Sequence, residues 1–310
     1  HVPETHDPEA TGRVDLPGAA LVTLGLVGLT MGLIEGPAHG WSSAFVLGSL
    51  VAGAALMVAF VVVERGARAP ILPPGIFSSV QFTATNVVTF VVYAALGGAL
   101  FLLPVELQQV SHYSPMGAGV SLLPLTGIML LFSARSGALA ARIGPRLQMA
   151  VGPVVAGLGL VMLRLIGSSG DYVTQVFPGV VVLGIGLVIT VAPLTSTALS
   201  SAPTEHAGMA SAVNNDVARA GGLIAVALLP AVAGITGLSY LHPQLFEHGF
   251  HNAVTITGVA AAAGGVLAAV FIRNPARVRR VRSPVRMSCP LDATPQCGDQ
   301  VARETVGEVA

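Results

Sequence analysis

The sequence predicts an all-α polytopic membrane protein with about eight transmembrane helices. Apolar stretches of roughly twenty residues follow one another along the chain, and this length crosses a hydrocarbon core ~30 Å thick. Hydrophobic residues make up 53% of the chain and charged residues only 10%, whereas a soluble domain carries about a quarter charged residues. Arginine, in addition, occurs in the loops after the second, fourth and eighth stretches and is absent from those after the odd-numbered stretches.

The first two apolar stretches, 16–35 and 44–63, are expected to form a tight helical hairpin. The turn between them contains Gly36, Pro37 and Trp41, and tryptophan is typical of the membrane interface. We therefore expect a linker at 1–15, a transmembrane hairpin at 16–63 and a proline-rich linker at 64–81.

Six further apolar stretches are expected to form one bundle over residues 82–273. They are 82–103, 116–134, 149–166, 175–197, 211–234 and 253–272. Six helices that divide into two triplets match the inverted repeats of secondary transporters. Small residues inside the stretches, among them Gly157, Gly186 and Gly265, predict close contacts between helices.

The arginine distribution predicts the orientation. Loops after the second, fourth and eighth stretches contain arginine, and loops after the first, third, fifth and seventh contain none. Because short loops rich in arginine stay on the cytoplasmic side, both linkers and the basic, disordered tail at 274–310 are expected in the cytosol of a bacterium, with the helices in its inner (plasma) membrane. Cys289 and Cys297 in that tail are expected to be reduced thiols.

Several classes of protein are excluded by the residues that are missing. Every positively charged side chain is arginine and none is lysine, which removes the phosphate-loop lysine of nucleotide-driven pumps. Glu247, His248 and His251 are expected in the loop before the last helix, without the rigid framework that a metal site needs. The sequence predicts no enzyme, no cofactor, no metal and no nucleic-acid partner.

Residues 137–146 read GALAARIGPR and resemble the cytoplasmic G-x-L-a-D-R-x-G-R-R signature of the major facilitator superfamily. The matching residues are Gly137, Leu139, Arg142, Gly144 and Arg146, with Ala141 in the place of the acid. The glycines allow a sharp turn, and the two arginines can bond carbonyls at helix C-termini or carboxylates. The motif is expected to act as a conformational latch, and a generic basic turn is the alternative.

Further stretches resemble one branch of that superfamily, the fourteen-helix drug:proton antiporters. They are 15–18, 35–41, 103–124 and 208–227. In this branch two six-helix bundles flank an extra pair of helices. The resemblance implies that 16–63 is the extra pair, that 82–273 is the C-terminal bundle, and that an N-terminal bundle is missing. Because alternating access needs two bundles, this chain alone is not expected to transport.

Polar side chains within the apolar stretches are costly in a membrane and are the candidates for cavity or coupling sites. They are Asn86, Glu106, Gln108, Asn214, Asn215, Asp216 and Arg219. Asp216 and Arg219 lie three residues apart, where pairing would lower the desolvation cost of both. We favour a structural or gating pair over direct proton coupling, and we expect the asparagines to bond between helices.

Glu106 and Gln108 lie at the outer end of the third apolar stretch. Members of the resembled branch usually place an aromatic or apolar residue at the position of Glu106. Its carboxylate is either solvated, which the edge position favours, or titrates with external pH after partial burial. Gln108 matches a glutamine of the branch and is expected to line the outer vestibule.

The resemblance implies export of small hydrophobic or cationic compounds by proton antiport, as in multidrug efflux and antibiotic resistance, by a longer chain. The expected partners are the lipid bilayer, the small-molecule substrate, protons and the missing N-terminal six-helix bundle. Two alternatives remain open: an exporter of a single endogenous metabolite, and a non-transporting fragment or membrane scaffold.

Overall fold

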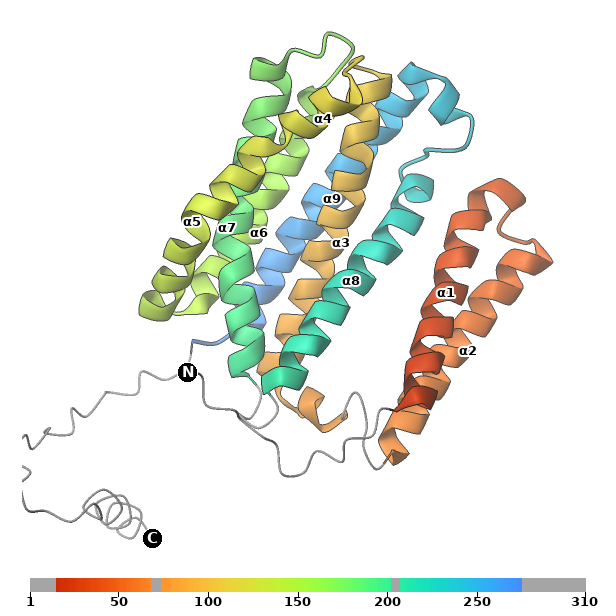
Figure 1. Ribbon diagram of the computed structural model, residues 1–310, viewed down its shortest axis with the longest axis vertical. Helices are drawn as coiled ribbons and strands as arrows, with labels where there is room; N and C mark the ends of the chain where they lie inside the picture. The colour runs from red at the N-terminus through yellow and green to blue at the C-terminus, as the bar shows by residue number, and fades with distance from the viewer. Residues whose placement is uncertain (1–14, 68–73, 202–206, 275–310) are drawn as a thin grey trace, which may run out of the picture. The chain divides into compact units, whose positions relative to one another are not determined.

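The computed structural model describes residues 15–67, 74–201 and 207–274, and within these ranges it contains helices and no strand (Figure 1). The α-helices are α1 (Leu16–His39), α2 (Ala44–Gly66), α3 (Val80–Gln109), the short α4 (Pro115–Ser121), α5 (Leu123–Ile143), α6 (Pro145–Met162), α7 (Phe177–Ser200), α8 (Ala207–Val232) and α9 (Pro243–Phe271). Short helical turns are η1 (Pro74–Ser78), η2 (Leu163–Leu165), η3 (Tyr172–Val176) and η5 (Ser239–Leu241). Eight helical spans are long and apolar enough to cross a membrane, which confirms the predicted fold class.

Short polar side chains fix where several helices begin. Asp15 accepts a hydrogen bond from Gly18 N at 3.0 Å, Ser79 accepts one from Phe82 N at 3.2 Å, and Ser114 accepts one from Gly117 N at 3.0 Å. Each bond satisfies a backbone N–H that has no partner inside the helix. Most of the predicted segment 1–15, part of the linker 64–81 and nearly all of the tail 274–310, with Cys289 and Cys297, lie outside the described residues.

The structure corrects several predicted helix ends. α9 begins at Pro243 instead of near 253, so Glu247, His248 and His251 lie on its first turns and not in a loop. The fourth apolar stretch consists of two helices, α4 and α5, that meet at Leu122. Hydropathy marks only the part of a helix that fits the hydrocarbon layer, whereas the backbone bonds continue into the polar residues beyond it.

The six-helix bundle consists of two triplets, α3 with α4–α5 and α6, then α7 with α8 and α9. Extensive contacts join α3 to α8 and to α9, α7 to α5 and to α6, and α6 to α9. Exchanging the triplets exchanges α3 with α7, α5 with α8 and α6 with α9. Under this exchange the α3–α8 contact corresponds to the α7–α5 contact, and the α3–α9 contact corresponds to the α7–α6 contact. The α6–α9 contact corresponds to itself. The packing therefore has the internal two-fold pattern of an inverted repeat.

These contacts place the helices in the neighbour order α5, α7, α6, α9, α3, α8. The helices within this series are well covered, with 39–56% of their central residues buried. The helices at its two ends are not, because only 11% is buried for the α4–α5 span and 17% for α8. The same triplet exchange relates these two least buried helices, so each triplet contributes one open flank.

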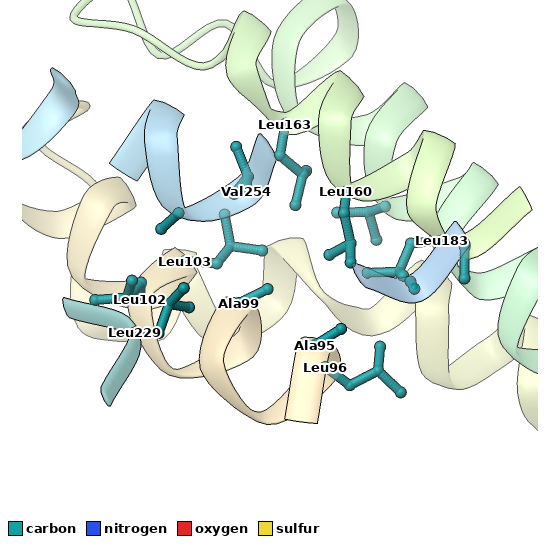
Figure 2. Packing of buried hydrophobic residues seen from close by; sticks show 14 of the residues in the cluster. Ala95, Leu96, Ala99, Leu102, Leu103, Leu160, Leu163, Leu183, Leu229 and Val254 are labelled. Atoms are coloured by element: carbon teal, nitrogen blue, oxygen red, sulfur yellow. The ribbon is translucent and has the colours of Figure 1, made fainter. Parts of the chain in front are cut away.

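The core fills the space between α3, α6, α7 and α9. Figure 2 shows Leu103 of α3, Leu160 of α6 and Leu183 of α7 within one cluster of side chains, and each is completely buried. Close backbone contacts surround this core, because a methyl group on Gly97 of α3 would press against Gly222 of α8. Glycine at such positions lets the helix backbones touch, as the small residues of the sequence predict.

Arginines mark one end of the bundle. The tight turn between α5 and α6, with Arg142 and Arg146, lies there together with Arg273 at the end of α9. We call it the arginine end. The opposite end, which we call the far end, carries the loop 110–114 between α3 and α4.

Candidate functional site

Arg146 ties the α5–α6 turn to the last turn of α9. Its Nε and Nη2 donate to the backbone oxygen of Ala269 at 3.0 and 2.7 Å, and its backbone N–H donates to Oδ1 of Asn274 at 3.0 Å. The carbonyls of a final helical turn have no partner inside the helix, and a guanidinium complements the negative end of the helix dipole. Arg146 therefore joins α6 of the first triplet to α9 of the second triplet at the arginine end.

The remaining motif residues shape this contact in different ways. Gly144 has a positive φ of 90° and faces the Asn274 side chain, a conformation that favours glycine. Gly137 is half-buried, and a methyl group there would touch only Ala192. Leu139 and Arg142 are exposed, and Arg142 makes no hydrogen bond or ion pair with a described residue. The structure therefore gives the latch contact to Arg146 and not to Arg142.

A second connection at the arginine end was missed in the sequence. Gln81 Nε2 donates to the backbone oxygen of Arg273 at 2.9 Å, and the backbone N–H of Arg273 donates to Gln81 Oε1 at 3.0 Å. The start of α3 and the end of α9 are thus held by a reciprocal amide pair. Nothing in the sequence relates Gln81 to a residue 192 positions away.

Replacing Arg146 by alanine is expected to loosen the last turn of α9. Amide hydrogen exchange at 268–273 should accelerate about fivefold, because an exposed charge-assisted contact is worth roughly 1 kcal/mol. Hydrogen exchange with mass spectrometry on the reconstituted chain measures this effect. Arg142→Ala is the matched control and should leave the same amides unchanged, whereas equal acceleration in both variants would contradict the latch.

Three polar residues join α3 to α8 inside the bundle. Asn214 Nδ2 donates to Asn86 Oδ1 at 3.2 Å and to Thr89 Oγ1 at 2.8 Å, and all three side chains are buried. Asn86 Nδ2 in turn donates to the backbone oxygen of Phe82 at 3.0 Å. Asn86 and Asn214 therefore hold two helices together and do not line an open cavity.

The other polar residues of α8 lie on its open flank. Asn215, Asp216 and Arg219 are exposed, and no described residue bonds or pairs with Asp216 or Arg219. The expected pair between them is therefore not formed. At 1.5 Å per residue, Asp216 lies about 13 Å and Arg219 about 18 Å from the first residue of α8. Charged groups at that depth cost several kcal/mol against lipid, so this face requires water or polar protein beside it.

Glu106 and Gln108 lie at the far end of α3 in opposite environments. Gln108 is exposed, and its Nε2 donates to the backbone oxygen of Pro104 at 3.0 Å. Glu106 is completely buried, and neither carboxyl oxygen has a hydrogen-bond partner within the described ranges. The expectation that Glu106 is solvated is therefore wrong, because the polar start of α9 continues as helix and covers the end of α3.

Hydrogen bonds between loops close the far end. Ser111 Oγ donates to the backbone oxygen of Gly167 at 3.0 Å, and Tyr113 OH donates to that of Gly170 at 2.8 Å. Burial raises the pKa of the Tyr113 hydroxyl, and the nearby Asp171 and Tyr172 raise this pKa further. Tyr113 therefore remains a neutral donor at physiological pH, and the loop 110–114 is fixed to the loop before η3.

The buried Gln148 is a further interhelical contact that was missed in the sequence. Its Nε2 donates to Ser136 O at 3.2 Å and to Ser136 Oγ at 3.1 Å, joining α5 to α6. The signal was a glutamine directly before the apolar stretch 149–166. Among the described residues, no group of three or more His, Cys, Asp or Glu side chains is placed to hold a metal ion.

Comparisons with known proteins agree with this architecture. A family model described as Major Facilitator Superfamily matches residues 1–226. The tetracenomycin C resistance and export protein of Streptomyces glaucescens is 34% identical over 69% of this chain and 40% of its own length. The puromycin resistance protein pur8 of Streptomyces alboniger is 32% identical over 79% of this chain and 48% of its own length.

The multidrug resistance protein Stp of Mycobacterium tuberculosis is 30% identical over 76% of this chain and 44% of its own length. The chain thus spans less than half the length of each of these three relatives. All three names refer to resistance, and one also to export.

Proposed function

The chain belongs to the major facilitator superfamily and is a multi-pass membrane protein, and from this premise we propose that it forms the C-terminal part of a drug exporter. The exporter moves small hydrophobic or cationic compounds out of the bacterial cell in exchange for protons. Relatives named for resistance to unrelated antibiotics support this substrate class. The protein is a carrier in this proposal, with no chemical step on the substrate.

The open flank of α8 is the observation that carries the proposal. Asp216 and Arg219 lie deep in a membrane span, exposed and without partners among the described residues. A lipid-facing position for both would be costly. A water-filled pathway between two bundles supplies the polar surroundings that they need. The open flank of α5, related to α8 by the triplet exchange, is the second surface available to the other bundle.

The arginine end faces the cytosol in this proposal. Short loops rich in arginine stay on the cytoplasmic side of the plasma membrane. The Arg146 contact with α9 then closes the bundle on the cytosolic side, where substrate enters an exporter. Rocking of two bundles exposes the α8 face alternately to the two sides of the membrane, while the buried Asn86–Asn214 contact keeps α3 and α8 together.

Transport is tested in inverted membrane vesicles that contain the chain together with an N-terminal six-helix half. A pH gradient is formed first, and lipophilic cations from a panel of unrelated structures are then added. We expect several compounds to dissipate the gradient, because each inward-moving substrate molecule releases protons in exchange. Vesicles with the chain alone are the control and should show no response.

Each other outcome of the vesicle assay separates the alternatives. A response to one compound only would favour the exporter of a single endogenous metabolite. Two of the relatives are named for a single compound each, tetracenomycin C and puromycin, and this supports the alternative. No response to any compound with both halves present would contradict transport and leave a membrane scaffold.

A further inference from the structure

Glu106 is an ionisable group in the core of the bundle that forms no hydrogen bond through its carboxyl oxygens and no ion pair with any described residue. It lies in the last turns of α3, and its side chain is 0% exposed. Its neighbours Leu102, Leu103, Leu107 and Val110 belong to the main hydrophobic cluster. In the part of the chain that the structure describes, both carboxyl oxygens lack a hydrogen-bond partner, although a buried carboxyl group normally has at least one.

No positively charged side chain among the described residues pairs with Glu106. The elements packed against this half of α3 are α4, α7, the second half of α8 and the start of α9. The first three carry no ionisable residue there, and α9 contributes Glu247, His248 and His251. Glu247 acts on Glu106 electrostatically and has the same sign of charge.

Other ionisable groups of the far end are directed elsewhere. His248 and Arg164 are exposed, and His251 Nε2 is 3.0 Å from the backbone oxygen of Ile166. The remaining ones are His112, Tyr113, Asp171, Tyr172, Tyr240 and His242. Among the described residues Glu106 forms no ion pair. An ionised carboxylate in this position would cost several kcal/mol, and the neutral acid avoids most of that cost.

Glu247 is the more exposed of the two interacting carboxyl groups at the far end. It is half-buried on the first turns of α9, and its carboxylate lies beside Gly167 in the loop after η2. Water at the far end is therefore more accessible to Glu247 than to the completely buried Glu106. Pro104 lies two residues before Glu106 inside α3, and a proline removes one backbone hydrogen bond and allows the helix to bend there.

We propose that Glu106 is a proton-binding site of the bundle, loaded from the far end by way of Glu247. A carboxylate oxygen of Glu106 accepts one proton, and the neutral acid is then stable among the leucines. Release of that proton recreates a carboxylate, which must meet water, so release requires α3 and α9 to separate near Pro104. Use of this proton to drive export rests on the proposed function, whereas proton binding itself does not.

Infrared spectroscopy of the purified 310-residue chain in lipid vesicles tests the proposal. Glutamate is labelled with ¹³C at the side-chain carboxyl, so that the absorption of a protonated glutamic acid shifts relative to unlabelled protein. At neutral pH and without any transported compound, we expect a label-sensitive carboxylic acid component. Glu106→Gln should abolish this component, and the matched control Glu35→Gln, on the hairpin helix α1 and outside the proposed proton route, should retain it.

Identical spectra for the wild type and Glu106→Gln would overturn the proposal, as would the absence of any such component in the wild type. If Glu106→Gln does not fold, Glu106→Asp keeps a carboxyl group at the site. The component should then persist but lose its sensitivity to the glutamate label, and a component still sensitive to the label would equally overturn the proposal. These spectra need no transport, so a failed vesicle assay with a positive spectrum contradicts only the exporter.

Discussion

Replacing Gly186 by alanine is expected to destabilise the bundle by about 1–3 kcal/mol, although the change adds a single methyl group. That methyl group would press against the backbone of Ala156, so α6 and α7 would have to move apart. Gly159 of α6 makes the reciprocal approach to the backbone of Leu183. The two glycines thus bring α6 and α7 together where the triplets join, and thermal unfolding of the purified chain in detergent measures the loss.

Gly127→Ala is the control that isolates packing from helix propensity. Gly127 lies on α5, and a methyl group there meets nothing within 4 Å. Since alanine favours a helix by roughly 1 kcal/mol over glycine, this variant should be as stable as the wild type or more stable. Equal thermal stability of Gly186→Ala and Gly127→Ala would show that the α6–α7 contact tolerates a methyl group, contrary to the structure.

The number and order of the membrane helices could be predicted because the hydrocarbon layer imposes one length on every apolar stretch. Helix ends were predicted less well for the same reason. The residues from Pro243 to His251 are too polar to count as membrane-spanning, yet they form the first turns of α9. These turns cover the end of α3 and thereby bury Glu106. No periodicity in either segment indicates that contact.

Within the site, the kind of interaction that a polar residue makes could be predicted better than the residue with which it interacts. Arg146 was expected to bond a helix end, but the sequence does not indicate that this end is Ala269 of α9. The spacing of Asp216 and Arg219 suggested a pair, whereas both side chains extend from the open flank of α8. A spacing of three residues places two side chains on one face of a helix, and it does not decide whether they turn toward each other or toward water.

In membranes that contain the chain together with an N-terminal six-helix half, a cysteine in place of Asp216 is expected to react with a water-soluble maleimide, in a background carrying Cys289→Ser and Cys297→Ser. The reason is that Arg219 remains on the same face and keeps water beside it, deep in the span. Val266→Cys on α9 is the matched control. Val266 is 60% exposed in the bundle and lies only five residues from Phe271, the last residue of α9.

Depth cannot explain a difference between these two positions, because Asp216 is nine residues from the first residue of α8 and therefore lies deeper than Val266. Depth alone would make Val266→Cys the more reactive. If the α8 flank borders an aqueous pathway, Asp216→Cys reacts at least tenfold faster than Val266→Cys, because maleimides attack the thiolate, which forms in water and not in lipid. Equal, slow labelling at both positions would place the α8 flank in lipid or under tightly packed protein and would remove the observation on which export was proposed.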